Sequence, residues 1–193
     1  MGDPRKLRKK YSKPIHPWQK FRIDDEKVLL EEYGLKNKKE IWKIASKVKE
    51  FSIQAKSLIA STTEQGEKEK MQLLAKLNKI GLLSENADLD DVLGLEIRNL
   101  MERRLQTMVH RKGLAKSAKQ ARQFIIHQHI MVGNKKITVP SYIVKRGEED
   151  IISFAPISQL ADPEHPEREQ KKKEQKTKRI KVTKKSRKQR GQR

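Results

Sequence analysis

The sequence contains no cysteine. Without thiols the chain can form no disulfide bond, no thiolate metal site and no cysteine nucleophile, although this absence leaves the cellular compartment open. It also has no apolar run near the roughly 20 residues that a membrane-spanning helix needs, and no apolar segment follows the basic residues of positions 1–13. We therefore expect no membrane partner, no secretory signal and a cytosolic location.

Acidic residues are missing from one long internal stretch. From Arg103 to Gly147 the chain runs 45 residues with eleven Lys or Arg and without Asp or Glu. Such stretches are usually disordered tails, but this one has amphipathic helix periods, a capping signature and a glycine-containing turn. A folded surface of one charge sign implies a polyanionic partner. We expect its cations to find few acidic partners within the chain.

The charge of the whole chain agrees with this interpretation. Its formal net charge is +21 and its isoelectric point is near 10.1, so nucleic acid is the default partner. Residues 1–13 hold six basic and one acidic residue, and residues 171–193 hold thirteen and one. We expect the basic ends to stay disordered until nucleic acid neutralises them. Protease footprinting of the free protein should cleave within residues 171–190 and spare the folded part; protection of this tail without nucleic acid would contradict the expectation.

Aromatic residues make up only 5% of the chain and apolar residues 34%, which is low for a globular domain. We expect one or two small domains whose modest cores an ordered partner stabilises. One aromatic cluster, His16, Trp18 and Phe21, follows the N-terminal arm and is flanked by Lys20 and Arg22. We interpret it as a staple that packs the arm on the body; the alternative is stacking on bases or sugars.

The first half of the folded part is expected to be helical. Residues 24–33 predict a weakly amphipathic helix that begins with acidic residues. A second helix follows Asn37, whose spacing to Glu40 is close to a capping box. A third helix follows a loop at residues 61–67 and ends at Gly81. Six lysines on the other face of the second helix either line phosphates or form a solvated face: Lys38, Lys39, Lys43, Lys47, Lys49 and Lys56.

The second half predicts a helix pair. Residues 95–112 continue a helical period that Gly113 ends, with a hydrophobic contact from Leu114 back onto the last turn. Ser117 and Gln120 then form an S-x-x-Q capping box that opens the next helix. Two helices are therefore expected to meet across a short turn.

A small sheet is expected after the helix pair. Residues 130–132 and 135–139 predict a hairpin joined by the Gly133-Asn134 turn, and residues 151–154 supply a later strand. The predicted fold class is α+β and mostly α: a helical N-terminal subdomain, a helix-turn-helix and sheet module, and basic extended ends.

Several motifs support a family resemblance: Arg103-Arg104-Leu105, Gly113-Leu114-Ala115-Lys116-Ser117, Gln120-Ala121-Arg122, Ile130-Met131-Val132 and Val139-Pro140-Ser141-Tyr142. In order and spacing they resemble the RNA-binding module named after ribosomal protein S-four. Further motifs lie outside that module: Met1-Gly2-Asp3-Pro4-Arg5, His16-Pro17-Trp18, Glu32-Tyr33-Gly34-Leu35-Lys36-Asn37-Lys38, Glu40-Ile41-Trp42 and Leu93-Gly94-Leu95. Together they resemble the archaeal and eukaryotic form of that small-subunit ribosomal protein family, over roughly residues 1–160.

This resemblance implies a function. Members of the family bind small-subunit ribosomal RNA at a junction of several helices, join early in subunit assembly and influence decoding accuracy. The implied partners are this RNA and the neighbouring small-subunit ribosomal proteins, with no small-molecule substrate and no enzymatic activity. Carried over to this sequence, the implied RNA-facing residues of the module are Arg103, Arg104, Arg111, Lys112, Lys116, Ser117, Lys119, Gln120, Arg122, Lys135 and Lys136. The basic arm adds Arg5, Lys6, Arg8, Lys9 and Lys10 as candidates.

The chemistry of these residues suits RNA. The helix that begins at Ser117 offers backbone N–H groups and a partial positive charge to a phosphate. A-form RNA hides its base edges, so a basic, shaped surface recognises the position of the backbone. Because a guanidinium can fork onto a phosphate or stack on a base, we rank Arg104, Arg111 and Arg122 above the lysines for specificity. The alternative for each residue is a solvated face.

No cofactor is expected. The chain has no phosphate-binding glycine loop and no nucleophile elbow, and His127 and His129 have neither a thiol nor a nearby carboxylate to complete a metal site. Some bacterial relatives carry a zinc-binding cysteine cluster, which this chain cannot build. Many family members have an Asn-Gly turn where this chain has Gly133-Asn134, which leaves the hairpin type open.

Two other functions compete with a ribosomal role. An RNA-modifying enzyme, such as a pseudouridine synthase, would need a catalytic domain, and the lysine-rich helical sequence before the module is too short for one. A free-standing RNA-binding factor leaves the arm and the helical subdomain unexplained. We divide the chain into an arm (1–23), a helical subdomain (24–97), an RNA-binding module (98–155), and a linker with a basic tail (156–193).

Overall fold

The computed structural model describes residues 9–162, 165 and 166. The predictions for Arg5, Lys6, Arg8 and the basic tail lie outside these residues. The described part contains α1 (Lys20–Glu32), α2 (Lys38–Ile59), α3 (Glu64–Ile80), α4 (Leu89–Leu93), α5 (Ile97–Glu102), α6 (Leu105–Arg111), α7 (Ala118–Ile126), β1 (Ile130–Val132), β2 (Lys135–Lys136) and β3 (Ile152–Phe154), with 3-10 turns at Arg146–Glu148 and Gln159–Ala161. The predicted α+β, mostly helical fold class is confirmed. None of the described helices is long and apolar enough to cross a membrane.

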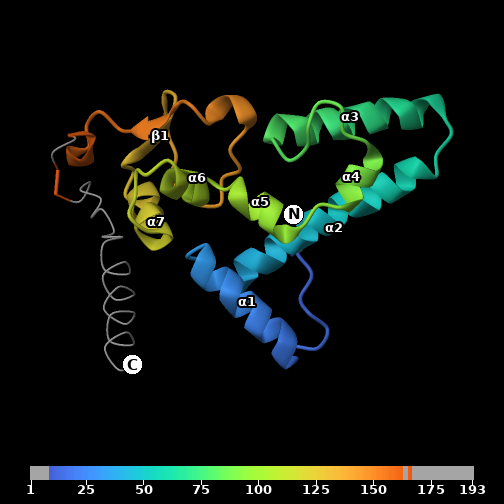
Figure 1. Ribbon diagram of the computed structural model, residues 1–193, viewed down its shortest axis with the longest axis horizontal. Helices are drawn as coiled ribbons and strands as arrows, with labels where there is room; N and C mark the ends of the chain where they lie inside the picture. The colour runs from blue at the N-terminus through green and yellow to red at the C-terminus, as the bar shows by residue number, and fades with distance from the viewer. Residues whose placement is uncertain (1–8, 163–164, 167–193) are drawn as a thin grey trace, which may run out of the picture.

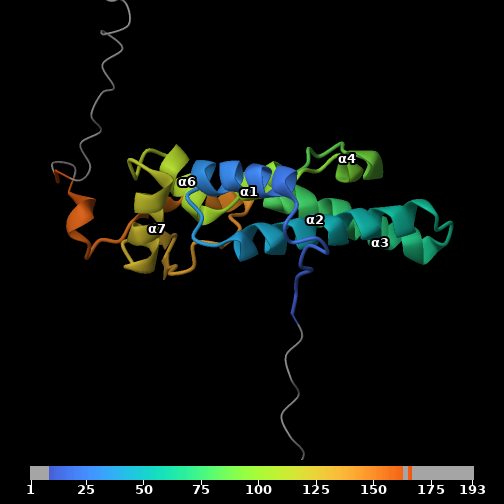
Figure 2. The same ribbon diagram turned by 90° about the horizontal axis from the view of Figure 1, so that it is seen from below.

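The molecule is elongated and flat, with its two halves at opposite ends (Figures 1 and 2). At one end α2 and α3 form a long helical hairpin, and α4 packs on α2. At the other end lie α6, α7 and the small sheet. Between them α5 contacts α2, and α1 runs from the basic arm toward α7. The N-terminal half of α2 therefore lies closest to the module.

Three apolar clusters form the core of the described part of the chain. The module has its own cluster, built around Leu105, Ile125 and Ile130, none of which is exposed to solvent. A second cluster joins α2, α3 and α4 around Ala55, Leu77 and Val92. The third is assembled from α2, α5 and the connection between α1 and α2: Tyr33, Leu35, Ile41, Ile44, Leu100 and Met101. This third cluster connects the helical half to the segment that leads into the module.

The predicted helix over residues 95–112 is wrong, because the structure divides it into α5 and α6. At the break, Arg104 forms a β-bridge with Ile143. The backbone N–H of Leu105 donates to the carbonyl oxygen of Tyr142 at 2.8 Å, and Val144 N–H donates to the Arg103 carbonyl at 2.9 Å. These hydrogen bonds to a segment some forty residues away take the place of helical ones.

Two helix starts and one helix cap differ from the predictions. α2 begins after Asn37, as predicted, but the capping box of Asn37 and Glu40 is absent, since Asn37 makes no side-chain cap. The third helix begins at Glu64, within the expected loop, because the Thr63 hydroxyl accepts the Gly66 N–H at 3.2 Å. α1 begins at Lys20, without acidic residues in its first turn.

The predicted helix end at Gly113 and the predicted cap at Ser117 are confirmed. Gly113 follows α6 with φ of 73°, and Leu114 N–H donates to the Val109 carbonyl, which closes the helix end. The Ser117 hydroxyl accepts the Gln120 N–H at 3.2 Å, as predicted. The Gln120 side chain returns to the N–H of Lys116 instead of Ser117, at 2.7 Å.

The sheet is antiparallel with strand order β2-β1-β3. Val132 pairs with Lys135, so Gly133 and Asn134 form a two-residue hairpin loop. Gly133 has φ of 59°, and among the described non-glycine residues only Gln128 has a positive φ. These φ signs are those of a type II′ turn, which settles the hairpin type that the sequence left open.

The aromatic staple is a wrong prediction. The side chains of Trp18 and Phe21 are 89% and 76% exposed and do not pack on the body. The arm is held by a polar contact instead, from the N–H of Ser12 to the hydroxyl of Ser46 on α2 at 3.0 Å.

Candidate RNA-binding surface

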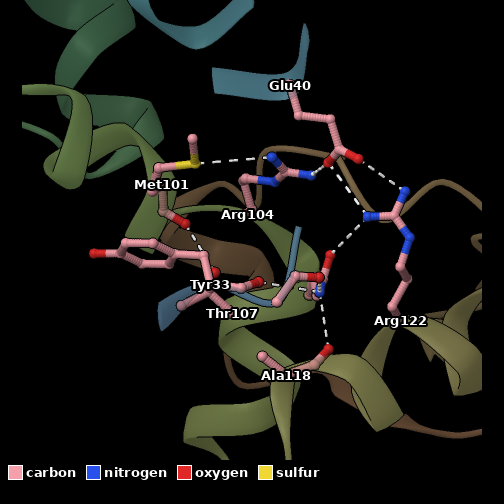
Figure 3. A network of polar contacts seen from close by, with 9 residues as sticks. Tyr33, Glu40, Met101, Arg104, Thr107, Ala118 and Arg122 are labelled. Carbon is pink, nitrogen blue, oxygen red and sulfur yellow. Dashed lines mark hydrogen bonds and ion pairs between the residues drawn. The ribbon is translucent and has the colours of Figure 1, made fainter. Parts of the chain in front are cut away.

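A carboxylate on α2 connects the helical half to the module. Glu40 Oε2 lies 2.5 Å from Arg104 Nη2, and Glu40 Oε1 lies 2.9 Å from Arg122 Nη2 on α7 (Figure 3). Arg104 is only 1% exposed, and its Nη1 also donates to the Met101 sulfur at 3.7 Å. Arg122 keeps 22% of its side chain exposed. One acid thus neutralises two arginines that the sequence placed on the RNA-facing surface.

The electrostatics of this cluster stabilise the charged carboxylate. Burial by itself raises the pKa of Glu40, but the hydrogen bonds from Arg122 and Arg104 and their charges outweigh it and hold the pKa below its ordinary value. Glu40 is therefore ionised at neutral pH. Both guanidinium groups are held in fixed positions by a charge-assisted hydrogen bond.

Gln106 on α6 strengthens the contact between the helical half and the module, which we call the joint. Its side-chain amide nitrogen lies within hydrogen-bond distance of three carbonyl oxygens: Tyr33 at 3.2 Å, Gly34 at 3.0 Å and Ala118 at 2.8 Å (Figure 3). Its side-chain oxygen accepts from Arg122 Nη1 at 3.5 Å. No sequence pattern indicates this role, because an isolated glutamine in a short helix is typical of an exposed position.

The corner between α1 and α2 contacts the start of α7 closely. Gly34 has φ of 59°, and a Cβ built on it would lie 2.9 Å from the Ala118 Cβ and 3.0 Å from the Lys119 nitrogen. Only glycine fits both the backbone conformation and the space. The two halves therefore meet through backbone as well as through charge.

A basic groove opens beside this joint. It has a volume of about 380 Å³ and is lined by α2, by Arg104 and Arg122, and by the segment from Pro140 to Ile143. Three lysines of α2 line it: Lys39, Lys43 and Lys47. All three are exposed, and none of their ammonium groups makes an ion pair or hydrogen bond with another described residue. These lysines are the part of the six-lysine face that adjoins the module, whereas Lys38 is paired with Glu26 at 3.1 Å.

The expectation that the cations of the acid-free stretch find few partners is wrong. Arg103 pairs with Glu149 and also donates to the Val144 carbonyl at 3.3 Å. Arg111 pairs with Glu102 at 2.6 Å. These acids, like Glu40, lie just outside the stretch or far from it in sequence, and folding brings them to it. All four arginines of the predicted module surface, Arg103, Arg104, Arg111 and Arg122, thus have an acidic partner.

The predicted lysines of the module are exposed. Lys112 donates to the Glu149 carbonyl, and Lys116 donates to the Pro166 carbonyl at 3.2 Å. Lys119 lies three positions before Arg122 on α7, but of the two only Arg122 lines the groove. Lys135 and Lys136 form β2, away from the groove lining. In the arm, Lys9 and Lys10 are exposed, while Ser117 and Gln120 serve the helix cap.

The two histidines that were considered as metal ligands, His127 and His129, contact other residues of the protein. His129 Nδ1 lies 2.8 Å from the Ser158 hydroxyl, and the rings of His127 and His129 are 6.4 Å apart. Residues 9–162, 165 and 166 contain no group of three or more metal-ligating side chains.

A helix pair with a small antiparallel sheet and a cationic face defines a class of nucleic-acid-binding modules, and the family model described as S4 domain matches residues 103–150.

Most of the chain is also similar to proteins described as small ribosomal subunit protein uS4. The relative from Methanococcus aeolicus is 55% identical over 166 residues, which is 86% of this chain and 94% of the relative. The relative from Ignicoccus hospitalis is 52% identical over 158 residues, covering 82% of this chain and 95% of its own. A third, from Nanoarchaeum equitans, is 52% identical over 82% of this chain. The chain belongs to the uS4 family of small ribosomal subunit proteins, which confirms the resemblance drawn from its motifs.

Proposed function

We propose that the chain is a structural protein of the small ribosomal subunit, where it binds ribosomal RNA at a multi-helix junction, helps to start subunit assembly and contributes to decoding accuracy. The observation that carries the proposal is the 55% identity to a uS4 protein over 86% of the chain. The S4 domain within residues 103–150 supplies the RNA-binding module. The relatives are ribosomal proteins, so the chain is a component of the cytoplasmic ribosome and not an enzyme.

The RNA-binding surface in this proposal is the basic groove together with the exposed lysines of α7 and β2. Lys39, Lys43 and Lys47 line the groove, and they offer mobile point charges to phosphates. Arg122 keeps part of its fork exposed and can bind a phosphate while Glu40 fixes its position. Buried Arg104 takes a supporting role, because it holds Glu40 and not RNA.

The same proposal covers the division of the chain. We propose a helical subdomain over residues 24–97 and an RNA-binding module over residues 98–155. Separate apolar clusters support this division, since the module cluster draws only on residues from Leu105 onward. α5 lies at the boundary, because Leu100 and Met101 pack with α1 and α2. The RNA-binding surface is then composite, with contributions from both parts.

Sucrose-gradient sedimentation of the tagged protein at moderate and high salt, followed by sequencing of the bound RNA, tests the function. We expect the protein to remain with small subunits at high salt, with reads concentrated at one junction of the small-subunit RNA. Migration with free or diverse RNAs would favour a free-standing RNA-binding factor. Salt matters in this test because non-specific phosphate contacts weaken steeply as salt rises.

A further inference from the structure

The segment that leads into α1 holds large apolar side chains in solvent. Ile15 and Trp18 are each 89% exposed, and Phe21 is 76% exposed. No ring contact within the described residues involves either aromatic side chain. Exposure of this much apolar area in so short a segment is unfavourable in water and marks a contact surface.

The position of Trp18 is fixed by its surroundings. Arg22 Nη2 donates to the Pro17 carbonyl at 2.8 Å, and Arg22 also pairs with Glu26 at 3.6 Å. Glu26 is 5% exposed and accepts a hydrogen bond from Trp42 on α2. The turn that carries Trp18 is thus tied to the first two helices, while the indole itself remains free.

The charge around this turn selects the partner. Four exposed lysines surround it in sequence, and no acidic residue occurs between positions 9 and 23. None of the four ammonium groups makes an ion pair or hydrogen bond with another described residue: Lys9, Lys10, Lys13 and Lys20. Exposed aromatic rings among unpaired cations are the combination that binds unpaired nucleotides, because every base offers a π-face and every nucleotide a phosphate.

We propose that Trp18 stacks on an unpaired base of the ribosomal RNA, with Phe21 beside it and the four lysines on the flanking phosphates. This inference rests on the proposed function and extends it. The turn would be a second RNA-contacting site, at the end of α1 that lies away from the module (Figure 1). Its mode of binding differs from that of the groove, since it reads single-stranded bases and not the shape of a helix.

Filter binding of the full chain tests the proposal with three probes: a small-subunit ribosomal RNA transcript from one of the archaeal species above, a single-stranded oligonucleotide and a fully paired RNA duplex. We expect Trp18→Leu to weaken binding to the transcript and the single strand by about tenfold, and to leave duplex binding unchanged. Trp18→Phe keeps an aromatic face and should restore most of the affinity. Met71→Ala removes a side chain that is 68% exposed on α3 and serves as the matched control, without effect on any probe.

Equal affinity of the wild type and Trp18→Leu for the transcript would overturn the inference, as would equal losses on the single strand and the duplex. Normal RNA affinity with poor incorporation into assembled subunits would also overturn it, and would show that a neighbouring protein covers Trp18. The proposed function fails separately, if the wild type does not prefer the transcript over an unrelated RNA of the same length.

Discussion

At the scale of single residues, Glu40 holds the two halves of the molecule together. It pairs with an arginine that is almost fully buried and with a second one on α7. Two buried or half-buried guanidinium groups share this single carboxylate, and breaking such a pair leaves an uncompensated charge behind. The stability of the joint should therefore depend on this one side chain more than on any exposed acid.

We predict that Glu40→Gln lowers the free energy of unfolding by about 3 kcal/mol at pH 7, because Arg104 loses its countercharge. Since the folded protein holds the pKa of Glu40 below its ordinary value, the contribution of Glu40 is complete above about pH 4.3 and is lost as pH falls through the lower folded pKa. Urea denaturation of both proteins between pH 7 and pH 3 measures this, and their difference should shrink at the acidic end. Glu31→Gln on the exposed side of α1 is the control. A difference below about 0.5 kcal/mol at pH 7 would rule out the role given to Glu40.

Arg122 offers a second test at this scale. We expect Arg122→Ala to weaken binding to small-subunit ribosomal RNA by about tenfold, because the groove loses a guanidinium group that Glu40 holds in position. Lys76→Ala removes the same charge from α3, where the ammonium lies 5.6 Å from the Phe51 ring centroid, and should change affinity less than twofold. Filter-binding titrations compare the two variants, with circular dichroism to verify folding. Equal losses would contradict the assignment of Arg122 to the RNA surface.

Prediction from sequence reached some of these residues and missed others for a physical reason. The Ser117 cap was predictable because its partner, Gln120, lies three positions away. Glu40 is 64 positions from Arg104 and 82 from Arg122, so no local pattern could connect them. A charge count along the chain therefore overstated how many cations are free.

At the scale of elements, some helix ends depend on local hydrogen bonds and could be predicted, whereas others depend on distant segments and could not. The end of α6 was predictable, because Gly113 closes the helix through hydrogen bonds to its own last turn. The break between α5 and α6 was not, because it depends on pairing with the segment from Tyr142 to Val144. Helical periodicity continues through that break, since the apolar residues on both sides still face a core.

The lysine face of α2 gives a prediction at this scale. We expect the triple substitution Lys39→Gln, Lys43→Gln and Lys47→Gln to weaken RNA binding and to reduce the slope of log affinity against log salt by about two, since these lysines line the groove. The matched control removes three exposed lysines outside the groove: Lys49, Lys56 and Lys68. Binding titrations over a range of salt concentrations measure both slopes. A control slope that falls as far as the groove variant would show that only net charge matters.

At the scale of the whole molecule, the core that residues 9–162 form is divided into three small clusters along an elongated body (Figure 2). Each cluster buries few side chains, and the joint between the halves is largely polar. A protein built in this way gains much of its stability from a partner that spans both halves. The composite basic surface is suited to such a partner, because one bound RNA would contact α2 and α7 together.

We therefore predict that small-subunit ribosomal RNA raises the melting temperature of the protein. A site occupied at about 100 times its dissociation constant adds roughly 2.7 kcal/mol, and the gain should fall as salt rises. Thermal unfolding followed by tryptophan fluorescence, with and without RNA, measures the shift. An unrelated RNA of equal length is the control, and a shift of the same size with both would mean that stabilisation carries no specificity.

The long separation in sequence between Glu40 and its arginines also affects how the protein folds while it is being translated. Translation delivers Glu40 first, and at roughly 5 to 20 residues per second the chain needs about 4 to 16 s to reach Arg122. During that interval α1, α2 and α3 can already pack, but the carboxylate that will join the halves has no arginine partner until Arg104 is made, and it lacks Arg122 throughout. The groove cannot exist until the later arginine has been made and has folded back onto an early helix. The RNA-binding surface is thus among the last features that a nascent chain acquires, and a polypeptide truncated directly before residue 122 would keep its first helices and Arg104 but lack the pair between Glu40 and Arg122.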